Sequence, residues 1–181
     1  VAGIARDPHD DGFEPLAVND FDGDAMGDSL QRNFGTNALR INADTVTGGP
    51  LPAGWTLGAS HDFDADGKAD LMWIDPATRK LSIWLMNGAT RLGTRTPNPD
   101  QSADANWSLA GAADADGDGD PDLLWYNQTT GKLVIWTLDG NQVRVSGNFT
   151  YPPSVGSNVW RAVAWGDYGR GLPSAPLGMP D

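Results

Sequence analysis

The pattern Asp-x-Asp-x-Asp-x-x-x-Asp occurs three times in this chain of 181 residues. Its twelve aspartates are half of the 24 acidic residues in the sequence. Carboxylates this close together repel one another unless a hard cation binds between them, and calcium takes about six to eight oxygen ligands. The pattern therefore predicts three calcium sites. Their aspartates are Asp20, Asp22, Asp24 and Asp28; Asp62, Asp64, Asp66 and Asp70; and Asp114, Asp116, Asp118 and Asp122.

Each loop offers oxygen donors at fixed positions. Side chains at positions 1, 3 and 5 face one concave side, a carbonyl at position 7 joins them, and the carboxylate at position 9 completes the shell. Glycine at position 6 permits the turn, because it adopts positive φ readily. The second and third loops have Gly67 and Gly119 there, but the first has Ala25, so we expect the first site to be the weakest. The predicted carbonyl donors belong to Met26, Lys68 and Asp120.

Other metal sites fit the loops less well. An EF-hand begins with the same aspartates but requires a bidentate glutamate at position 12, where this chain has Gln31, Trp73 and Trp125. Magnesium prefers a compact octahedral shell that retains several waters, whereas zinc and copper prefer nitrogen or sulfur donors. Calcium is the cation that the pattern favours.

Composition restricts the class of protein further. The formal net charge of -12 argues against nucleic acid or an anionic membrane as partner, and no stretch is apolar for long enough to span a membrane. Cysteine is absent, which removes disulfides and thiolate chemistry. One Glu and three Lys accompany 23 Gly and 13 Pro, a composition that disfavours long helices. We expect a protein without membrane spans, and a secretion signal, if one existed, to have been removed.

The acidic loops belong to a longer repeat. Phe13, Trp55 and Trp107 each stand seven residues before a loop, and Trp160 stands seven before Asp167, which indicates a partial fourth copy. The starting residues are 42, 52 and 53 positions apart. The predicted organisation is an N-terminal extension or cap over 1–12, a degraded first copy over 13–54, full copies over 55–106 and 107–159, and a partial copy with a tail over 160–181.

The pattern within a copy is typical of β-structure. Residues 81–86 alternate with a period of two and are rich in β-branched and aromatic side chains. Asn87-Gly88 and Asp139-Gly140 are typical of type I′ hairpin turns. The chain is therefore predicted to be all-β. In the second copy the expected strands lie near 55–59, 70–75, 81–86 and 89–93, with the acidic loop between the first two.

The second and third copies match almost residue for residue after the loop. Asp70-Leu-Met-Trp73 corresponds to Asp122-Leu-Leu-Trp125, and Leu81-Ser-Ile-Trp84 corresponds to Leu133-Val-Ile-Trp136. The first copy keeps the apolar Leu39 and Ile41 but has Gln31 and Asn42 where the others have tryptophan.

With these residues the chain resembles the FG-GAP or VCBS-type repeats of bacterial surface and secreted proteins, which are related to the blades of integrin α-subunit propellers. The resemblance extends over roughly residues 13–167. It implies four-stranded β-propeller blades with calcium in the loop between the first two strands. It also implies roles in adhesion, in carbohydrate recognition, or as an accessory module beside a catalytic domain.

The length conflicts with a closed propeller. Rings have about four to eight blades, so three and a half copies leave the ring incomplete within one chain. Repeat arrays must cover the apolar faces at their ends. The chain is a fragment of a larger propeller, or other chains complete it, or residues 1–12 and 145–181 form caps. We expect association between chains, as a homo-oligomer or with neighbouring propeller blades.

Two residue types remain to be assigned. Tryptophans that recur in each copy indicate packing between blades, although an exposed one could stack on a sugar; Trp165, which has no counterpart, is the first to inspect. His9 and His61 are the only imidazoles, and no nucleophile motif appears. A carboxylate pair for glycoside hydrolysis remains open among Asp75, Asp100, Asp104 and Asp139.

The sequence thus predicts a secreted, bacterial, calcium-binding repeat protein that acts by binding or self-assembly and is not an enzyme. Calcium is expected to be structural. The alternatives are a carbohydrate-binding or adhesin module with a glycan or a surface protein as ligand, and an accessory non-catalytic part of a larger secreted hydrolase.

Overall fold

The computed structural model describes residues 11–154 with the exception of residue 103. The predicted fourth copy with Trp160 and Asp167, Trp165, and the C-terminal tail lie outside the described residues. So do most of the predicted N-terminal extension and His9. Among the described residues no helix could span a membrane.

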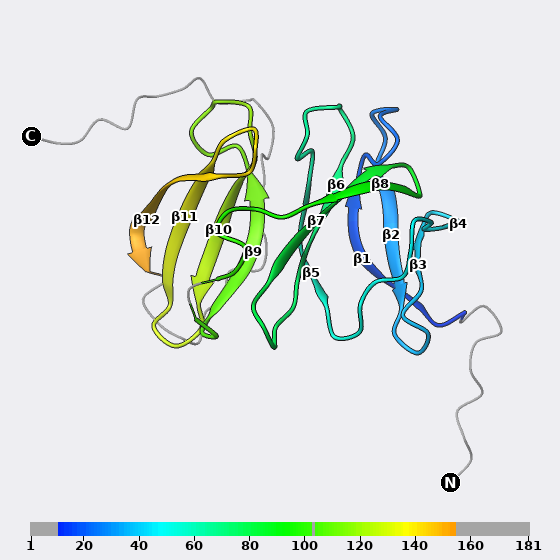
Figure 1. The fold of residues 1–181 in the computed structure, drawn as a ribbon, viewed down its shortest axis with the longest axis horizontal. Helices are drawn as coiled ribbons and strands as arrows, with labels where there is room; N and C mark the ends of the chain where they lie inside the picture. Colours follow the sequence, from blue (N-terminus) through cyan, green and yellow to red (C-terminus); the bar gives the residue numbers. More distant parts are fainter. Residues whose placement is uncertain (1–10, 103, 155–181) are drawn as a thin grey trace, which may run out of the picture.

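Three antiparallel four-stranded sheets make up the described chain (Figure 1). In each sheet the strands follow one another in sequence order, and the sheets lie side by side. This arrangement confirms the prediction of an all-β fold of four-stranded, propeller-like blades that do not close a ring. The first blade consists of β1 (Phe13–Asn19), β2 (Asp28–Asn33), β3 (Leu39–Ile41) and β4 (Asp44–Thr45); the second of β5 (Thr56–His61), β6 (Asp70–Ile74), β7 (Leu81–Asn87) and β8 (Thr90–Arg95); the third of β9 (Trp107–Ala113), β10 (Asp122–Asn127), β11 (Lys132–Leu138) and β12 (Arg144–Ser154).

The hairpin turns differ from the predicted type I′ turns. Asn87 pairs with Thr90, so Gly88 and Ala89 form the turn, and of the predicted pair Asn87-Gly88 only Gly88 has a positive φ, of 54°. In the third blade the positive φ falls on Gln142, at 58°. The Asp139 carboxylate accepts the backbone N–H groups of Asn141 and Val143 there, which favours a longer loop.

The first strands of successive blades lie next to one another and share an irregularity. The register shifts at residue 16 in β1, at residue 58 in β5 and at residue 110 in β9, so each first strand bends at the same place. A Cβ on Gly58 would lie 2.6 Å from Leu109 Cδ2. Glycine is required at this position because β9 approaches β5 so closely.

The core lies between the blades. One cluster joins Leu30 and Ile41 of the first blade to Trp73 and Trp84 of the second, and a like cluster joins the second and third blades. The indole rings pair, with centroids 5.5 Å apart for Trp73–Trp84 and 4.8 Å for Trp125–Trp136. Burying one aromatic side chain of ~150–250 Å² stabilises by about 4–6 kcal/mol as an upper figure. The prediction that these tryptophans pack between blades is confirmed.

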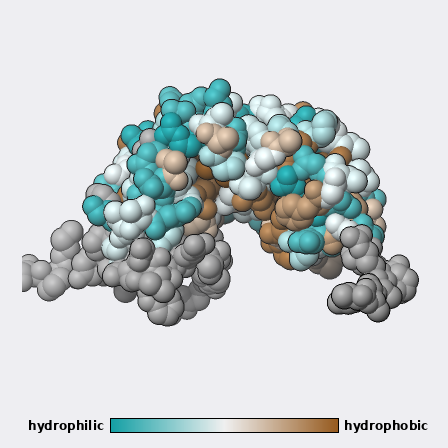
Figure 2. Space-filling view, turned by 90° about the horizontal axis from the view of Figure 1, so that it is seen from below, coloured by the Kyte–Doolittle hydropathy of each residue, from teal (hydrophilic) through white to brown (hydrophobic). Residues whose placement is uncertain are grey.

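The blades form an arch with a hollow on one side, where apolar residues are visible (Figure 2). The register of β2 with β3 places Leu30 opposite Ile41 and Gln31 opposite Arg40, so the two faces of the first blade differ. The Leu30 face packs on the second blade. The Gln31 face points away from it.

This outward face of the first blade is polar and bonded within itself. Arg40 donates to Gln31 Oε1 at 2.5 Å, forms an ion pair with Asp11, and lies 4.2 Å from the centroid of the Phe13 ring. Asn42 donates to Asp28 Oδ1 at 2.7 Å. Where the other blades present paired indoles to the preceding blade, the first blade presents an amide network.

Candidate metal centres

The aspartates that the pattern singled out converge in three clusters at one end of the blades. Each cluster brings three carboxylates together, with one oxygen from each within 4.8 Å of the other two. Calcium–oxygen distances of about 2.3–2.6 Å allow ligand oxygens to lie up to about 5 Å apart, so the spacing fits one calcium ion per cluster. The clusters are Asp20, Asp22 and Asp28; Asp62, Asp64 and Asp66; and Asp114, Asp116 and Asp122.

The clusters include nine of the twelve predicted carboxylates. The position-5 aspartates Asp24 and Asp118 stand outside the first and third clusters, and the position-9 Asp70 stands outside the second. Asp24 and Asp118 each accept the backbone N–H two residues further on, at 2.8 Å. The carbonyl groups of Met26, Lys68 and Asp120 stay predicted donors.

The first aspartate of each loop organises the backbone around it. Its two oxygens accept N–H groups three to five residues further along: Gly23 and Ala25 donate to Asp20, and Gly117 and Gly119 donate to Asp114, at 2.7–3.0 Å. These bonds lower the pKa of Asp20, outweighing the opposing effect of its partial desolvation. The bonds fold the loop so that the carboxylates at positions 1 and 3 share one side.

The last aspartate of each loop is buried and ties the loop to the third strand. Asp70 accepts Phe63 N–H at 3.0 Å and Met86 N–H at 2.7 Å, and Asp122 accepts Ala115 and Leu138 in the same way. Burial raises the pKa of Asp70 to about 7, although both N–H groups oppose the rise; the charges of Asp64 and Asp62 add to it. Burial likewise raises the pKa of Asp122. A bound cation would favour the ionised forms.

Two residues per loop adopt a left-handed backbone, at positions 4 and 6. Position 6 is Ala25, Gly67 or Gly119, with φ of 65°, 87° and 95°, and position 4 is Gly23, Ala65 or Gly117, with φ of 84°, 60° and 85°. The sequence indicated only position 6. The first two loops therefore each hold one alanine in a conformation that favours glycine, and the third holds none.

The second loop contains a buried oxygen that lacks a protein partner. Asp64 Oδ1 is inaccessible and has no hydrogen bond within the described part of the chain. Its neighbour Asp66 has one oxygen within 3.1 Å of Lys68 Nζ and the other 2.9 Å from Lys68 N. A buried carboxylate oxygen is costly unless a donor or a cation meets it, so the donor set fits a hard metal ion.

The comparison with known families assigns these loops. Residues 62–125, from the first aspartate of the second loop to Trp125, match the family described as FG-GAP-like repeat. The chain carries an FG-GAP-like repeat. The match confirms the family resemblance that the second and third copies indicated.

The other comparisons add little to the FG-GAP-like assignment. No curated protein matches the chain. A crystal structure of a protein of unknown function from Bacteroides caccae aligns with 74% of this chain at 15% sequence identity and a TM-score of 0.36. The alignment covers 40% of that protein chain.

In this FG-GAP-like array, each of the first two acidic loops also receives the hairpin of the following blade. The carbonyl of Phe21 accepts Gly88 N–H at 2.7 Å, and the carbonyl of Phe63 accepts Gln142 Nε2 at 2.6 Å. The first loop also accepts, at Asp20 O, the N–H of Ala69 from the second loop at 2.7 Å. The loops are therefore part of the blade–blade contact.

Gln142 is a site residue that sequence reasoning missed. Its side chain is 2% exposed, and its Oε1 accepts Arg95 Nη1 at 3.3 Å. The signal was weak, because the second blade uses the backbone N–H of Gly88 for the same contact. Only the spatial neighbourhood of Phe63 assigns a role to this glutamine.

The residues considered for catalysis have structural contacts. Asp75 accepts Ala77 N–H at 3.0 Å and the Thr78 hydroxyl, and these bonds lower its pKa. Asp104 accepts Asn106 N–H at 2.7 Å, and Asp139 accepts two N–H groups of its own loop. His61 packs its ring edge-on against Phe63, with centroids 6.4 Å apart.

Proposed function

We propose that this chain is a secreted, calcium-stabilised repeat module that acts by binding or self-assembly and not by catalysis. The observation that carries the proposal is the double use of the acidic loops. Each gathers three carboxylates, and the first two also hold the next blade through a backbone carbonyl. Metal binding at a loop is therefore coupled to the docking of blades.

Calcium would supply the positive charge that allows the gathered carboxylates to stay ionised. The residues that would hold it are the three clusters, joined by the carbonyls at position 7. If free calcium exceeds each dissociation constant tenfold, binding stabilises by about 1.4 kcal/mol per site, or roughly 4 kcal/mol for three independent sites. Typical domains have a net stability of only about 5–15 kcal/mol, so this contribution is large.

An extracellular location follows from the same reasoning. Sites of the affinity found in extracellular modules, on the order of 0.1–1 mM, fill only where calcium is abundant. FG-GAP-like repeats are typical of extracellular proteins, which supports secretion. We expect the module to be loosely packed in a calcium-poor cytoplasm and firm outside it.

Self-assembly, as a homo-oligomer or with neighbouring blades, is proposed to use the side of the third blade. The outward face of the first blade presents Gln31, Arg40 and Asn42 and lacks the indole pair that the later blades pack on their predecessor. Terminal repeats of arrays have such polar outer faces. A partner blade gains little apolar burial there.

The native mass in millimolar calcium and after chelation tests the assembly proposal. A calcium-dependent multimer of the 19.2 kDa chain is expected. A monomer in both conditions would contradict self-assembly, and binding to another ligand would then remain as the function.

A further inference from the structure

The two blade–blade contacts of this chain differ at the end opposite the acidic loops. Between the first and second blades the space is filled. Arg32, only 7% exposed, donates Nη1 to Trp55 O at 2.7 Å and Nε to Asn37 Oδ1 at 2.9 Å. Asn37 in turn donates to Leu51 O at 2.5 Å.

Between the second and third blades the equivalent space is open. Ile74 occupies the place of Arg32, since each stands four residues after its loop-closing aspartate. Arg79 occupies the place of Asn37, with the same left-handed backbone at 66° against 64°. Arg79 Nη1 lies 3.3 Å from Ser102 O, and a cavity of about 180 Å³ remains.

Polar groups and one indole line this cavity. Trp107, which is half-buried, stands beside Arg79, Ser108 and Gln128, and Gln128 donates to the Ser108 hydroxyl. Guanidinium, amide and hydroxyl groups therefore face the same space as an aromatic surface. Among the described residues that line it, none is acidic.

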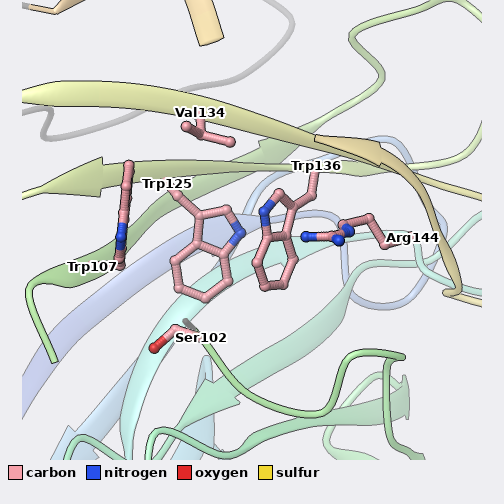
Figure 3. Close-up of a pocket in the computed structure, with 6 residues that line it drawn as sticks. All are labelled: Ser102, Trp107, Trp125, Val134, Trp136 and Arg144. Carbon is pink, nitrogen blue, oxygen red and sulfur yellow. The ribbon is translucent and has the colours of Figure 1, made fainter. Parts of the chain in front are cut away.

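A second cavity, of about 120 Å³, lies against the same indole. Trp107, Trp125 and Trp136 follow one another across it, with Arg144 beyond Trp136 and Ser102 on the side opposite Val134 (Figure 3). The Arg144 guanidinium lies 5.0 Å from the Trp136 ring centroid. Trp107 and Ser102 border both cavities.

We propose that this inter-blade groove binds one saccharide residue of a glycan, with a ring face against Trp107. A pyranose has an apolar C–H face that packs on an indole, and hydroxyl groups at its edge that hydrogen-bond to guanidinium, amide and hydroxyl side chains. The combination of one aromatic wall with neutral and basic polar groups matches that chemistry. An all-apolar ligand would leave Arg79 and Gln128 without use in recognition.

The groove is separate from the candidate metal centres. Thr56 and Trp107 begin β5 and β9, whereas the acidic loops follow the ends of these strands. The inference rests on the proposed function only in assigning the chain a binding role. Saccharide binding and calcium stabilisation can therefore fail independently.

The test is a titration of the ¹⁵N-labelled chain, in calcium, with methyl glycosides of glucose, galactose, mannose and N-acetylglucosamine, and with glucuronate. The eight indole N–H signals report on the tryptophans, and Trp107→Phe assigns the signal of Trp107. At least one probe is expected to shift that signal in a saturable way below about 50 mM. If no probe shifts it, the proposal is overturned.

A filled-groove variant provides the matched control. Ile74→Arg combined with Arg79→Asn recreates the Arg32–Asn37 pair that the chain already accommodates in its other interface. Binding is expected to weaken at least tenfold while the thermal unfolding transition is retained. Unchanged binding in this folded variant would overturn the assignment of the groove. If the double variant fails to fold, Gln128→Ala at the exposed rim must weaken binding instead, and unchanged binding in that variant would also overturn the assignment.

Discussion

At the scale of single residues, two alanines carry a backbone cost that the sequence only half revealed. Ala25 has a φ of 65° and Ala65 a φ of 60°, where the third loop has glycine at both positions. A left-handed conformation costs a non-glycine residue about 1–2 kcal/mol. The prediction that the first site is weakest rested on Ala25 alone, but the second loop has an equivalent strain.

Ala25→Gly and Ala65→Gly are each expected to stabilise the chain by about 0.5–1 kcal/mol, because relief of strain exceeds the larger entropy that glycine loses on folding. Denaturant unfolding in calcium measures the change. Gly119→Ala should destabilise by about 1 kcal/mol. Gly93→Ala is the control, since a Cβ there meets nothing within 4 Å and its φ is not left-handed. A loss of stability in both alanine-to-glycine variants would contradict the strain argument.

The buried Asp70 predicts how the metal-free chain responds to pH. Its pKa is raised from 3.8 to about 7, so the folded state favours the protonated carboxyl. That contribution to stability is complete below pH 4 and is lost as the pH rises through about 7. In chelator, the stability of the wild type relative to Asp70→Asn should therefore fall between pH 4 and pH 8. A relative stability that rises over this range would contradict the assignment.

At the scale of elements, the position-9 aspartates connect each loop to its blade. Asp122 accepts one N–H from its own loop, at Ala115, and one from the end of β11, at Leu138. Asp118 is in contrast exposed and accepts a single N–H within the loop. Both belong to the predicted ligand set, but only Asp122 also fixes two strands.

Asp122→Ala in chelator is expected to cost about 1–3 kcal/mol, because it leaves two buried N–H groups unpaired without any contribution from metal. Asp118→Ala should change the stability in chelator by less than about 0.5 kcal/mol. Chemical denaturation of both variants with and without calcium separates the two roles. Equal losses in chelator would show that Asp122 has no structural role beyond that of Asp118.

The elements themselves were accessible from the sequence, and their mutual contacts were not. Alternating residues placed β6 and β7 close to their observed bounds, because the period of two directly reflects a strand with two faces. The turn at Gly88–Ala89 was shifted by one residue because register depends on pairing across the hairpin. Gln142 was missed because its partner Phe63 lies 79 residues away.

At the scale of the whole molecule, the first blade ends the array. Gln31 and Asn42 were interpreted from the sequence as degradation of the repeat. In the structure they belong to a polar outward face, where Asn42 bonds Asp28 and Arg40 bonds Gln31 and Asp11. The substitutions thus remove the apolar contact by which a preceding blade would dock.

Restoring the indole pair tests this capping role. The double variant Gln31→Trp with Asn42→Trp is expected to expose an apolar patch and to raise the native mass, by association through the first blade. The control is Ser29→Thr, a conservative change on the same blade. If the double variant keeps the wild-type mass, the amide network does not limit docking at this face.

Thermal unfolding in millimolar calcium and in chelator is the most direct test of the central claim that metal at the acidic loops stabilises the array. Three filled sites contribute roughly 4 kcal/mol, and in a chain of this length 1 kcal/mol shifts Tm by about 2–4 °C. Chelation is therefore expected to lower Tm by about 10 °C, with magnesium at equal ionic strength giving little recovery. The same Tm in calcium and in chelator would contradict the account.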